Sequence, residues 1–529
     1  MDLLQVSRLY HTIIGLQFIQ VFYRLKYRFV KPKRLELISN GLFTQLDLAD
    51  FPIKQTTLYL EKATWTFNFL NLERSFSNDM QDWAFADYGM LWTYNLNYFD
   101  WLHQLGMSKE VGLATLRKFY STPSSKNQII LHPYPTSLRI INTAKFVSKF
   151  GIKEKWLFHE LESDLMFLIG RLEYHLLANH LLENAFALYI GGLITKQEEF
   201  TRKGKKLLIR ELKKQVLNDG MHYERSPMYH LIILERLLDS LNFAKSTKDN
   251  LEPELRFYAT RMTGLVMNWQ DLDRIPMMQD SAYGIALSIP SILEYSHRLL
   301  GDDFPVAAND LGDSGYRRIN SGYFRLFANV GSLGPSYQPG HAHADELNFE
   351  LFYKGNPVIV DTGISTYEKN QRRQLERSTK SHNCVVVNSN NSSDVWSGFR
   401  VGRRAKVELI QDDEMVVAQH FGYAPIVVKR SWHSLNGTIV INDVLKNTPK
   451  RFEARGKLHF HPAISIERID KNTFNLFNNL VVKIESSSDT LDASICNYLY
   501  AHGYNSLNSA KVITYTCNNQ IQITIREVG

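Results

Sequence analysis

Cysteine is scarce in this chain of 529 residues. The three cysteines are Cys384, Cys496 and Cys517, and no two of them form a Cys-x-x-Cys pair. A single disulfide would leave an odd thiol, so a framework of disulfides is not expected.

Long hydrophobic runs are missing where a membrane anchor or secretion signal would be sought. The apolar stretch 13–22 is too short to cross a bilayer, so no integral membrane segment is expected. It lacks a basic n-region and a small-residue cleavage site, and Arg24, Lys26 and Arg28 follow it, so we interpret it as a helix. A cytoplasmic protein is the favoured interpretation. A periplasmic location and a helix lying on a membrane surface stay open.

An excess of one charge is nearly absent as well. The 61 basic and 54 acidic residues leave a formal net charge of +7, which permits an anionic substrate and predicts no nucleic-acid partner. The densest basic run, 202–214, carries apolar residues at helical spacing and is typical of a solvated helix face. The oligomeric state cannot be predicted from these features.

Aromatic residues, in contrast, are plentiful, with 26 Tyr, 30 Phe and 8 Trp. Flat rings with polar tips commonly line carbohydrate sites, and an aromatic-rich core explains the same composition equally well.

Periodicity divides the chain into two parts. Residues 1–310 show apolar residues recurring at three and four, which predicts helices, and aromatic-polar loops interrupt them. Residues 311–529 show alternating, β-branched runs separated by turn residues, which predicts an antiparallel sandwich. We therefore predict a multidomain α and β protein: an incomplete (α/α) toroid followed by an antiparallel β-sandwich, packed closely with a cleft between them.

Candidate polar residues of the helical part lie at predicted helix starts and in the aromatic loops. Asn179 and His180 precede a strongly apolar helix, where they either cap that helix or donate hydrogen bonds into the cleft. Pro227 fits a first helical turn, which places Tyr229 near the mouth of the toroid. The further candidates for substrate binding are Arg225, Tyr94, Asn95 and Arg139, and for Arg139 a buried ion pair is an equal alternative.

The sheet part holds the most informative motif, His341-Ala-His343. Asp361 follows His343 after 18 residues, and His382 follows Asp361 after 21, each on or beside a predicted strand. Adjacent strands can bring three such residues together, and two imidazoles with one carboxylate suit a zinc ion. Three unrelated polar residues on a sheet are the alternative.

Taken together, these motifs resemble the heparinase II/III-like polysaccharide lyases, alginate lyase-type members included. The resemblance covers most of the chain and is most specific in the sheet part, where four polar positions match in order and spacing. It implies the same two-domain fold. It also implies that Asn179 and His180 contact a uronate carboxylate, that Tyr229 is the catalytic tyrosine and that His341 is a catalytic histidine. Tyr367 matches a second tyrosine of the alginate-type members.

For the metal, the resemblance implies that His343, Asp361 and His382 bind one mainly structural Zn²⁺ per chain. The metal would stiffen the strand that carries His341 and hold its imidazole toward the helical part. Tyr229 suits proton transfer as base and as acid if a nearby positive charge, such as Arg225 or His341, lowers its pKa, and we expect it to do so.

The function that this resemblance implies is a lyase that cleaves a uronic-acid polysaccharide by β-elimination. The missing leader suggests a polymer made by the same cell, such as a capsule or exopolysaccharide. A uronate C5 epimerase shares the first chemical step and is the closest alternative. A glycoside hydrolase, which needs two carboxylates, and a non-catalytic glycan-binding protein are less favoured.

Overall fold

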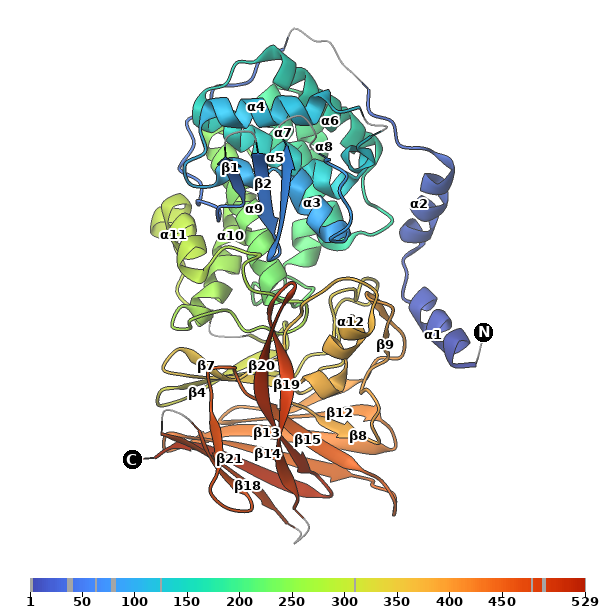
Figure 1. The fold of residues 1–529 in the computed structure, drawn as a ribbon, viewed down its shortest axis with the longest axis vertical. Coiled ribbons are helices and arrows are strands. Elements are labelled where there is room, and N and C mark those ends of the chain that lie inside the picture. Colours follow the sequence, from blue (N-terminus) through green and yellow to red (C-terminus); the bar gives the residue numbers. More distant parts are fainter. Residues whose placement is uncertain are drawn as a thin grey trace.

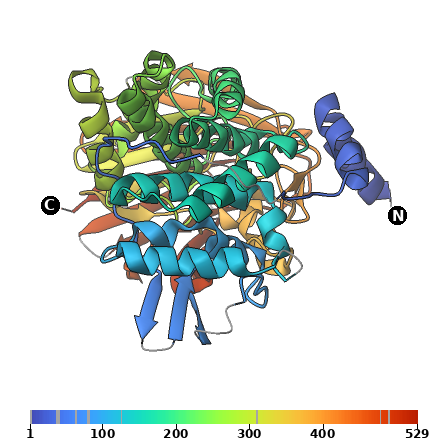
Figure 2. The same cartoon turned by 90° about the horizontal axis from the view of Figure 1, so that it is seen from above.

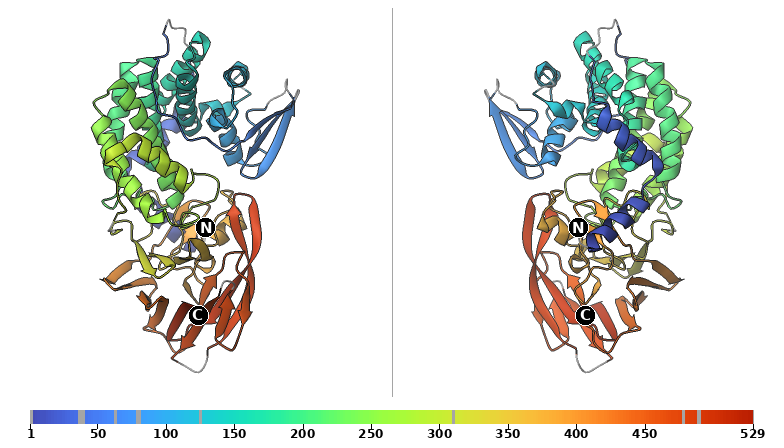
Figure 3. Two further views of the ribbon diagram at one scale, coloured as in Figure 1. Left: turned by 90° about the vertical axis from the view of Figure 1, so that its left-hand side faces the viewer. Right: turned by 90° about the vertical axis from the view of Figure 1, so that its right-hand side faces the viewer.

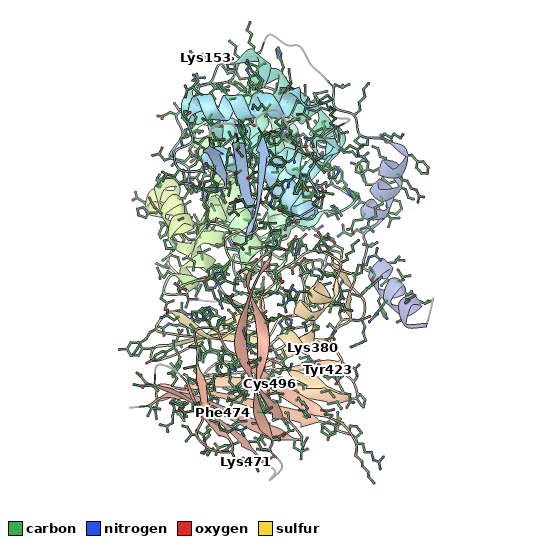
Figure 4. All side chains as sticks on the ribbon, in the orientation of Figure 1. Lys153, Lys380, Tyr423, Lys471, Phe474 and Cys496 are labelled. Carbon is green, nitrogen blue, oxygen red and sulfur yellow. The ribbon has the colours of Figure 1, made fainter. Side chains whose placement is uncertain are left out.

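The protein has two domains stacked along its long axis, with helices at one end and sheets at the other (Figure 1). Lys153 marks the far end of the helical domain and Lys471 the far end of the sheet domain (Figure 4). The structure is a computed structural model, and it describes residues 3–35, 41–61, 64–77, 82–123, 126–308, 311–476, 479–487 and 491–528.

The helical domain is built around α7, which packs against α5, α6, α8 and α9 and is buried along most of its length. Its α-helices are α3 (Met90–Tyr98), α4 (Lys109–Ser121), α5 (Pro133–Phe150), α6 (Lys155–Gly170), α7 (Ala178–Thr195), α8 (Glu198–Gln215), α9 (Pro227–Thr247), α10 (Glu252–Val266) and α11 (Ile289–Leu300). Short 3₁₀ helices are η1 (Asp100–His103), η2 (Gln128–Leu131), η3 (Met267–Trp269) and η4 (Gly301–Asp303). The predicted toroid is confirmed.

Several of these helices begin where the sequence supplies a cap. The side chains of Ser108, Ser226 and Ser288 each accept a hydrogen bond from a backbone N–H of the first turn. Pro227 follows Ser226 at a position where its missing N–H leaves no helical bond unmade. The start of α9, and with it Tyr229, is therefore fixed by local sequence.

Two N-terminal helices, α1 (Leu3–Ile14) and α2 (Phe18–Phe29), lie along one flank of the molecule, outside both domains (Figures 1 and 2). In the part of the chain that the structure describes, no helix has the length and apolarity needed to cross a membrane.

A small sheet that the sequence analysis did not predict projects from the helical domain. It consists of β1 (Leu58–Glu61), β2 (Thr64–Phe69) and β3 (Leu72–Ser77). Its β2–β3 turn meets the long β19–β20 hairpin of the sheet domain (Figure 3). The Asn71 side chain donates to the Tyr504 carbonyl at 2.9 Å, and the Asn505 side chain donates to the Leu70 carbonyl at 3.0 Å. We call this contact the hairpin bridge.

The sheet domain is antiparallel throughout its described strand pairs, as predicted. An eight-stranded sheet runs β11-β12-β13-β14-β21-β18-β17-β16, and two four-stranded sheets run β19-β20-β15-β8 and β4-β5-β6-β7. Their inward apolar side chains form one shared core, with the largest contribution from Val, Ile and Leu. The predicted sandwich is confirmed.

The strand bounds are β4 (Tyr316–Ser321), β5 (Phe324–Asn329), β6 (Phe349–Tyr353), β7 (Asn356–Ile359), β8 (Val385–Val387), β9 (Val395–Trp396), β10 (Arg400–Val401), β11 (Val407–Asp412), β12 (Met415–Tyr423), β13 (Ile426–Leu435), β14 (Thr438–Lys446), β15 (Ala454–His459), β16 (Ile466–Arg468), β17 (Thr473–Leu476), β18 (Leu480–Ser486), β19 (Ala493–Gly503), β20 (Ser506–Thr516) and β21 (Gln520–Glu527). The domain also holds α12 (Gln371–Glu376) and η5 (Thr379–Ser381).

The two domains share apolar contacts. The helical core continues into sheet-domain residues such as Tyr316, Phe352 and Tyr504. The predicted boundary at 310 falls at residues 309–310, which lie outside the described residues. The loops between β5 and β6, and between β7 and α12, face the helical domain and carry the candidate site.

Candidate functional site

Tyr229 sits in the first turn of α9 and faces the sheet domain. The residue is 9% exposed, and its hydroxyl lies 3.2 Å from the hydroxyl of Tyr367. The Tyr316 hydroxyl donates to the carbonyl of Arg225 at 2.6 Å and so ties the segment before α9 to the sheet domain. Tyr229 is therefore positioned by both domains.

His341 lies in the β5–β6 loop, directly over Tyr229. The two ring centroids are 4.0 Å apart, with the planes inclined by 31°. Nδ1 of His341 is 2.9 Å from Asp280, and Nε2 is 3.5 Å from Glu224. The catalytic tyrosine and histidine that the resemblance implied, Tyr229 and His341, come from different domains and are in contact.

Asp280 fixes the orientation of that imidazole. Arg373 donates to both of its carboxylate oxygens at 2.5 and 2.7 Å, and His343 Nε2 lies 2.8 Å away. Burial would raise the pKa of Asp280, but Arg373 and the two imidazoles hold it well below its usual range. Because the carboxylate is ionised, His341 donates to it through Nδ1, which leaves Nε2 as the ring nitrogen that does not face Asp280.

The expected effect on Tyr229 is wrong. Burial is the largest influence and raises the pKa of Tyr229 above its usual range, although Tyr367 and Arg373 lower it in part. Arg225 is not the nearby cation, because its guanidinium donates to the backbone carbonyls of Ser332 and Asp313. Tyr229 is thus a neutral phenol in the free protein, able to donate a proton.

The start of α7 carries the second group of candidates. Leu177 and Ala178 both adopt positive φ, an uncommon conformation for residues with a side chain, and turn the chain into the helix. Asn179 is 3% exposed, and its backbone N–H donates to Glu224 at 3.1 Å. Its side-chain amide forms no hydrogen bond with any described residue. Glu224 thereby connects the Asn179 segment to His341.

His180 pairs with a carboxylate behind it. Its Nδ1 lies 3.0 Å from Glu173, and its ring lies 4.7 Å from that of Tyr134. Burial lowers the pKa of His180, but Glu173 outweighs this and the net shift is upward. The imidazolium is therefore favoured, and it suits contact with an anion.

The remaining residues that were predicted to bind substrate have different surroundings. Tyr94 lies on α3, bonds His132 at 2.9 Å and begins a row of rings through Tyr98 and Tyr134 to His180. Asn95 donates to the Leu91 carbonyl of its own helix.

Arg139 needs a correction. Its side chain is fully buried and donates to both oxygens of Asp164, at 2.8 and 3.1 Å. A side chain so enclosed has no face for a sugar, so the ion pair with the scaffold is the interpretation that holds.

The three predicted zinc ligands lie in one buried region. His343 Nδ1 and His382 Nε2 are buried nitrogens without a hydrogen-bond partner in the described part of the chain, and their ring centroids are 5.3 Å apart. Asp361 accepts from the other nitrogen of His382, at 2.8 Å. No group of three or more described His, Cys, Asp or Glu residues is arranged to hold a metal.

These donors nevertheless fit a metal in part. Two unpartnered imidazole nitrogens deep in a protein are costly unless something binds them. Burial lowers the pKa of His343 to about 4, which keeps it neutral as a metal ligand must be. Asp361, as placed, orients His382 and is not aimed at the same point.

Sequence reasoning missed three residues that organise the site: Asp280, Glu224 and Arg373. All three lie outside the motifs, on a loop before α11, a loop before α9 and α12 respectively. Their proximity arises from tertiary packing, so no sequence spacing signals it.

Comparison with known proteins agrees with this geometry. Residues 140–292 match the heparinase II/III N-terminus, and residues 305–526 match the heparinase II/III-like C-terminal domain, which together cover more than half of the chain. A heparin-sulfate lyase of Pedobacter heparinus is 24% identical over 336 residues, 58% of this chain and 49% of that protein. A heparin-sulfate lyase of Bacteroides stercoris is 24% identical over 258 residues, 41% of this chain and 37% of that protein. The chain thus spans half or less of the curated relatives it matches.

Solved structures share the fold. A heparinase III crystal structure has a TM-score of 0.67 at 15% identity, covering 83% of this chain and 76% of the other. The heparan sulfate lyase HepC of Pedobacter heparinus has a TM-score of 0.56 at 17% identity, covering 96% and 87%. A chondroitin AC lyase of Streptomyces coelicolor, in complex with chondroitin sulphate, has a TM-score of 0.51 at 9% identity, covering 82% and 74%.

Proposed function

Because this chain belongs to the heparinase II/III-like family, we propose that it is a lyase that cleaves a uronic-acid polysaccharide by β-elimination. The observation that carries the proposal is the contact of Tyr229 with His341 at 4.0 Å, which joins a phenol of one domain to an imidazole of the other. Polymers made by the producing cell itself belong to the candidate substrates.

In the first step the negative charge of the uronate carboxylate must be neutralised, because the C5 proton beside a charged carboxylate is only weakly acidic. The free amide of Asn179 and the imidazolium of His180 supply hydrogen bonds that strengthen as charge moves onto the carboxylate oxygens. Glu173 raises the pKa of His180 and so favours the imidazolium.

The proton transfers are then divided between the stacked rings. Nε2 of His341 takes the C5 proton. Its Nδ1–H remains hydrogen-bonded to Asp280, whose negative charge stabilises the imidazolium that forms. The C4–O4 bond breaks, a C4–C5 double bond forms, and O4 takes the phenolic proton of Tyr229. Proton return from His341 to Tyr229 restores both groups. Each transfer contributes about 10²–10⁴-fold in rate.

A hydrolytic mechanism fits these residues less well. A hydrolase needs one carboxyl group as the acid and a second that is free to act as nucleophile or base. Burial raises the pKa of Glu224, but both oxygens of Asp280, the other acid beside His341, are held by Arg373 and two imidazoles, so Asp280 is not free for that second role.

Zinc belongs to the proposal as a structural element. It would be held by His343 and His382, with Asp361 orienting His382, and would fix the loop that carries His341. We expect purified protein to contain about one zinc per chain, and His343→Ala to lose both zinc and thermal stability. If His343→Ala keeps both, the ligand assignment is wrong.

The test is a panel of uronic-acid polymers followed by ultraviolet absorbance of the new double bond. Heparan sulfate and chondroitin sulfate come first, because structures of similar fold are named for them, with alginate and the producing cell's surface polymer beside them. Reactions in deuterated water distinguish the lyase from the closest alternative, a C5 epimerase. Deuterium at C5 without new absorbance identifies an epimerase and overturns the lyase. Absence of both across the panel overturns C5 proton chemistry.

A further inference from the structure

The helix α2 has its apolar stripe on the outside. Gln20, Tyr23 and Tyr27 face the protein: the Gln20 amide donates to the Leu176 carbonyl at 3.2 Å, and the Tyr27 hydroxyl donates to the Leu172 carbonyl at 2.7 Å. The opposite face carries four large apolar residues at helical spacing, 40–90% exposed. They are Phe18 at 84%, Phe22 at 50%, Leu25 at 56% and Phe29 at 80%.

This arrangement is the reverse of an ordinary surface helix, which buries its apolar stripe. The spacing 18, 22, 25, 29 is one continuous row at 3.6 residues per turn. The apolar surface continues onto α1, where Tyr10, Ile13 and Ile14 are each more than 60% exposed. Contiguous exposed apolar surface of this kind marks a site of association.

Positive charge frames the stripe. On a helix that turns about 100° per residue, Lys26 and Arg28 lie on opposite flanks of the row. Lys31 and Lys33 follow directly after α2, and both are exposed. None of these four, nor Arg24, forms an ion pair with a carboxylate in the described part of the chain.

The charge is confined to this segment. Residues 3–35 contain seven Lys and Arg and no Asp or Glu. The rest of the chain contains 54 basic and 54 acidic residues, so the whole net charge of +7 resides here. Among the described residues, only Arg8 and Arg34 of the seven form ion pairs, Arg8 with Asp394 and Arg34 with Glu160 and Asp164.

We propose that α1 and α2 form a docking surface for an anionic lipid bilayer, with the row Phe18, Phe22, Leu25 and Phe29 entering the headgroup boundary. An interfacial helix of this type combines Phe and Leu on one face with Lys and Arg beside it. Basic side chains next to the row bind anionic headgroups, and their long stems reach outward from the apolar boundary.

Other occupants fit less well. A second copy of this chain would bring two segments of the same charge together, with no carboxylate in either to pair them. An acidic polysaccharide pairs with the cations but offers no apolar layer for three Phe side chains. In Figures 1 and 2, α1 and α2 lie at the edge of the molecule with their outer side uncovered, and Figure 4 shows their side chains extending outward.

Polar contacts on the inner faces of α1 and α2 hold both helices in place. The Arg8 guanidinium binds Asp394 at 2.9 Å, and the Thr12 hydroxyl donates to the Val401 carbonyl at 3.1 Å. Arg171 donates to the Val30 carbonyl at 2.6 Å and stacks on Tyr27 at 4.0 Å. The inner faces are anchored by polar groups, which leaves the apolar faces available.

Co-sedimentation of the full chain with vesicles tests the proposal. One set is phosphatidylcholine alone, and the other contains phosphatidylglycerol as well. We expect binding to the anionic set, weakened by salt because the charge term is screened. The variant Phe18→Ser/Phe22→Ser/Phe29→Ser should lose at least about tenfold in binding, and Lys26→Glu/Arg28→Glu a similar factor.

Matched controls change the same chemistry elsewhere. Val306 is 81% exposed on the helical domain, so Val306→Ser removes an exposed apolar group away from α2. Lys450→Glu/Arg451→Glu reverses two exposed charges in the sheet domain. Both controls should bind as the unmodified protein does, and near-equal melting temperatures exclude misfolding.

Three results overturn the proposal. One is no binding to anionic vesicles. Another is binding that survives the Phe variant. The third is a dimer in sedimentation velocity that the Phe variant dissociates, which assigns the face to a second copy. Turnover of a soluble oligosaccharide should be the same in all variants, so failure of the lyase proposal and failure of this one are distinguishable.

Discussion

Two buried carboxylates, Asp164 in the helical scaffold and Asp280 at the site, look alike and serve different ends. Each is fully buried and bound by a buried arginine, Asp164 by Arg139 and Asp280 by Arg373. Neighbouring cations hold the pKa of both below its usual range against the opposing effect of burial. Burial, charge and pairing therefore do not separate a structural acid from one at a site.

The difference lies in the other partners. Asp164 also binds Arg34 and the hydroxyl of Tyr120, which remain within the scaffold. Asp280 binds His341, whose side chain is 13% exposed and lies on Tyr229. A buried charge gains a chemical role when a partner can exchange a proton where a substrate reaches it.

The largest expected effect on kcat comes from removing the hydroxyl of Tyr229 at the candidate site. Tyr229→Phe should lower kcat by about 10²–10⁴-fold, because the leaving oxygen loses its proton donor. Its melting temperature should stay near that of the unmodified protein, since among the described residues the Tyr229 hydroxyl forms a hydrogen bond only with Tyr367. The control Tyr120→Phe removes the hydroxyl that donates to Asp164 in the scaffold, and its kcat should stay unchanged. Equal kcat values for the two variants would contradict the assigned role.

A smaller loss of rate, joined to a loss of stability, is expected from the acids themselves. Asp280→Asn and Asp164→Asn each leave a buried arginine without its carboxylate, which costs about 3–5 kcal/mol in the free energy of unfolding. Only Asp280→Asn should also lower kcat, by about 10²-fold, because an amide no longer fixes the His341 tautomer. Urea unfolding gives the first quantity, and turnover below the melting transition gives the second. A kcat deficit in both variants would remove the distinction.

The smallest effect concerns the charge behind His180. Glu173 raises the pKa of His180, so Glu173→Gln lowers it and leaves less imidazolium at any given pH. As the pH is raised, KM should therefore begin to rise at a lower pH than in the unmodified protein. Near neutrality the KM of Glu173→Gln should be about fivefold higher, which corresponds to the loss of one ordinary hydrogen bond. His180→Gln, which donates without titrating, should abolish that pH dependence. An unchanged KM profile in Glu173→Gln would separate His180 from substrate binding.

The sequence predicted the two-domain fold well because its signals are local. Helical spacing, β-branched alternation, and caps such as Ser226 with Pro227 act within a few residues. The β1–β3 sheet was missed, since its strands are short and lie among helices. The pairing of Tyr229 with His341 was reached through a resemblance to known lyases.

What the sequence could not give is the set of contacts that only packing creates. Asp280, Arg373 and Glu224 stand 61, 32 and 117 residues from His341 in the sequence, and none of them belongs to a motif. The pKa of Tyr229 was predicted in the wrong direction because burial, which decides it, is invisible in one dimension. Arg139 illustrates the same limit, as exposure decides between a sugar ligand and a scaffold ion pair.

The hairpin bridge has a mechanical consequence. The domains are fastened twice, once at their broad apolar contact and once at the tips joined by Asn71 and Asn505. Two ordinary hydrogen bonds, about 1 kcal/mol each, are far weaker than a folded core. Any separation of the domains would therefore break the two hydrogen bonds at these tips before it disrupts the broad apolar contact.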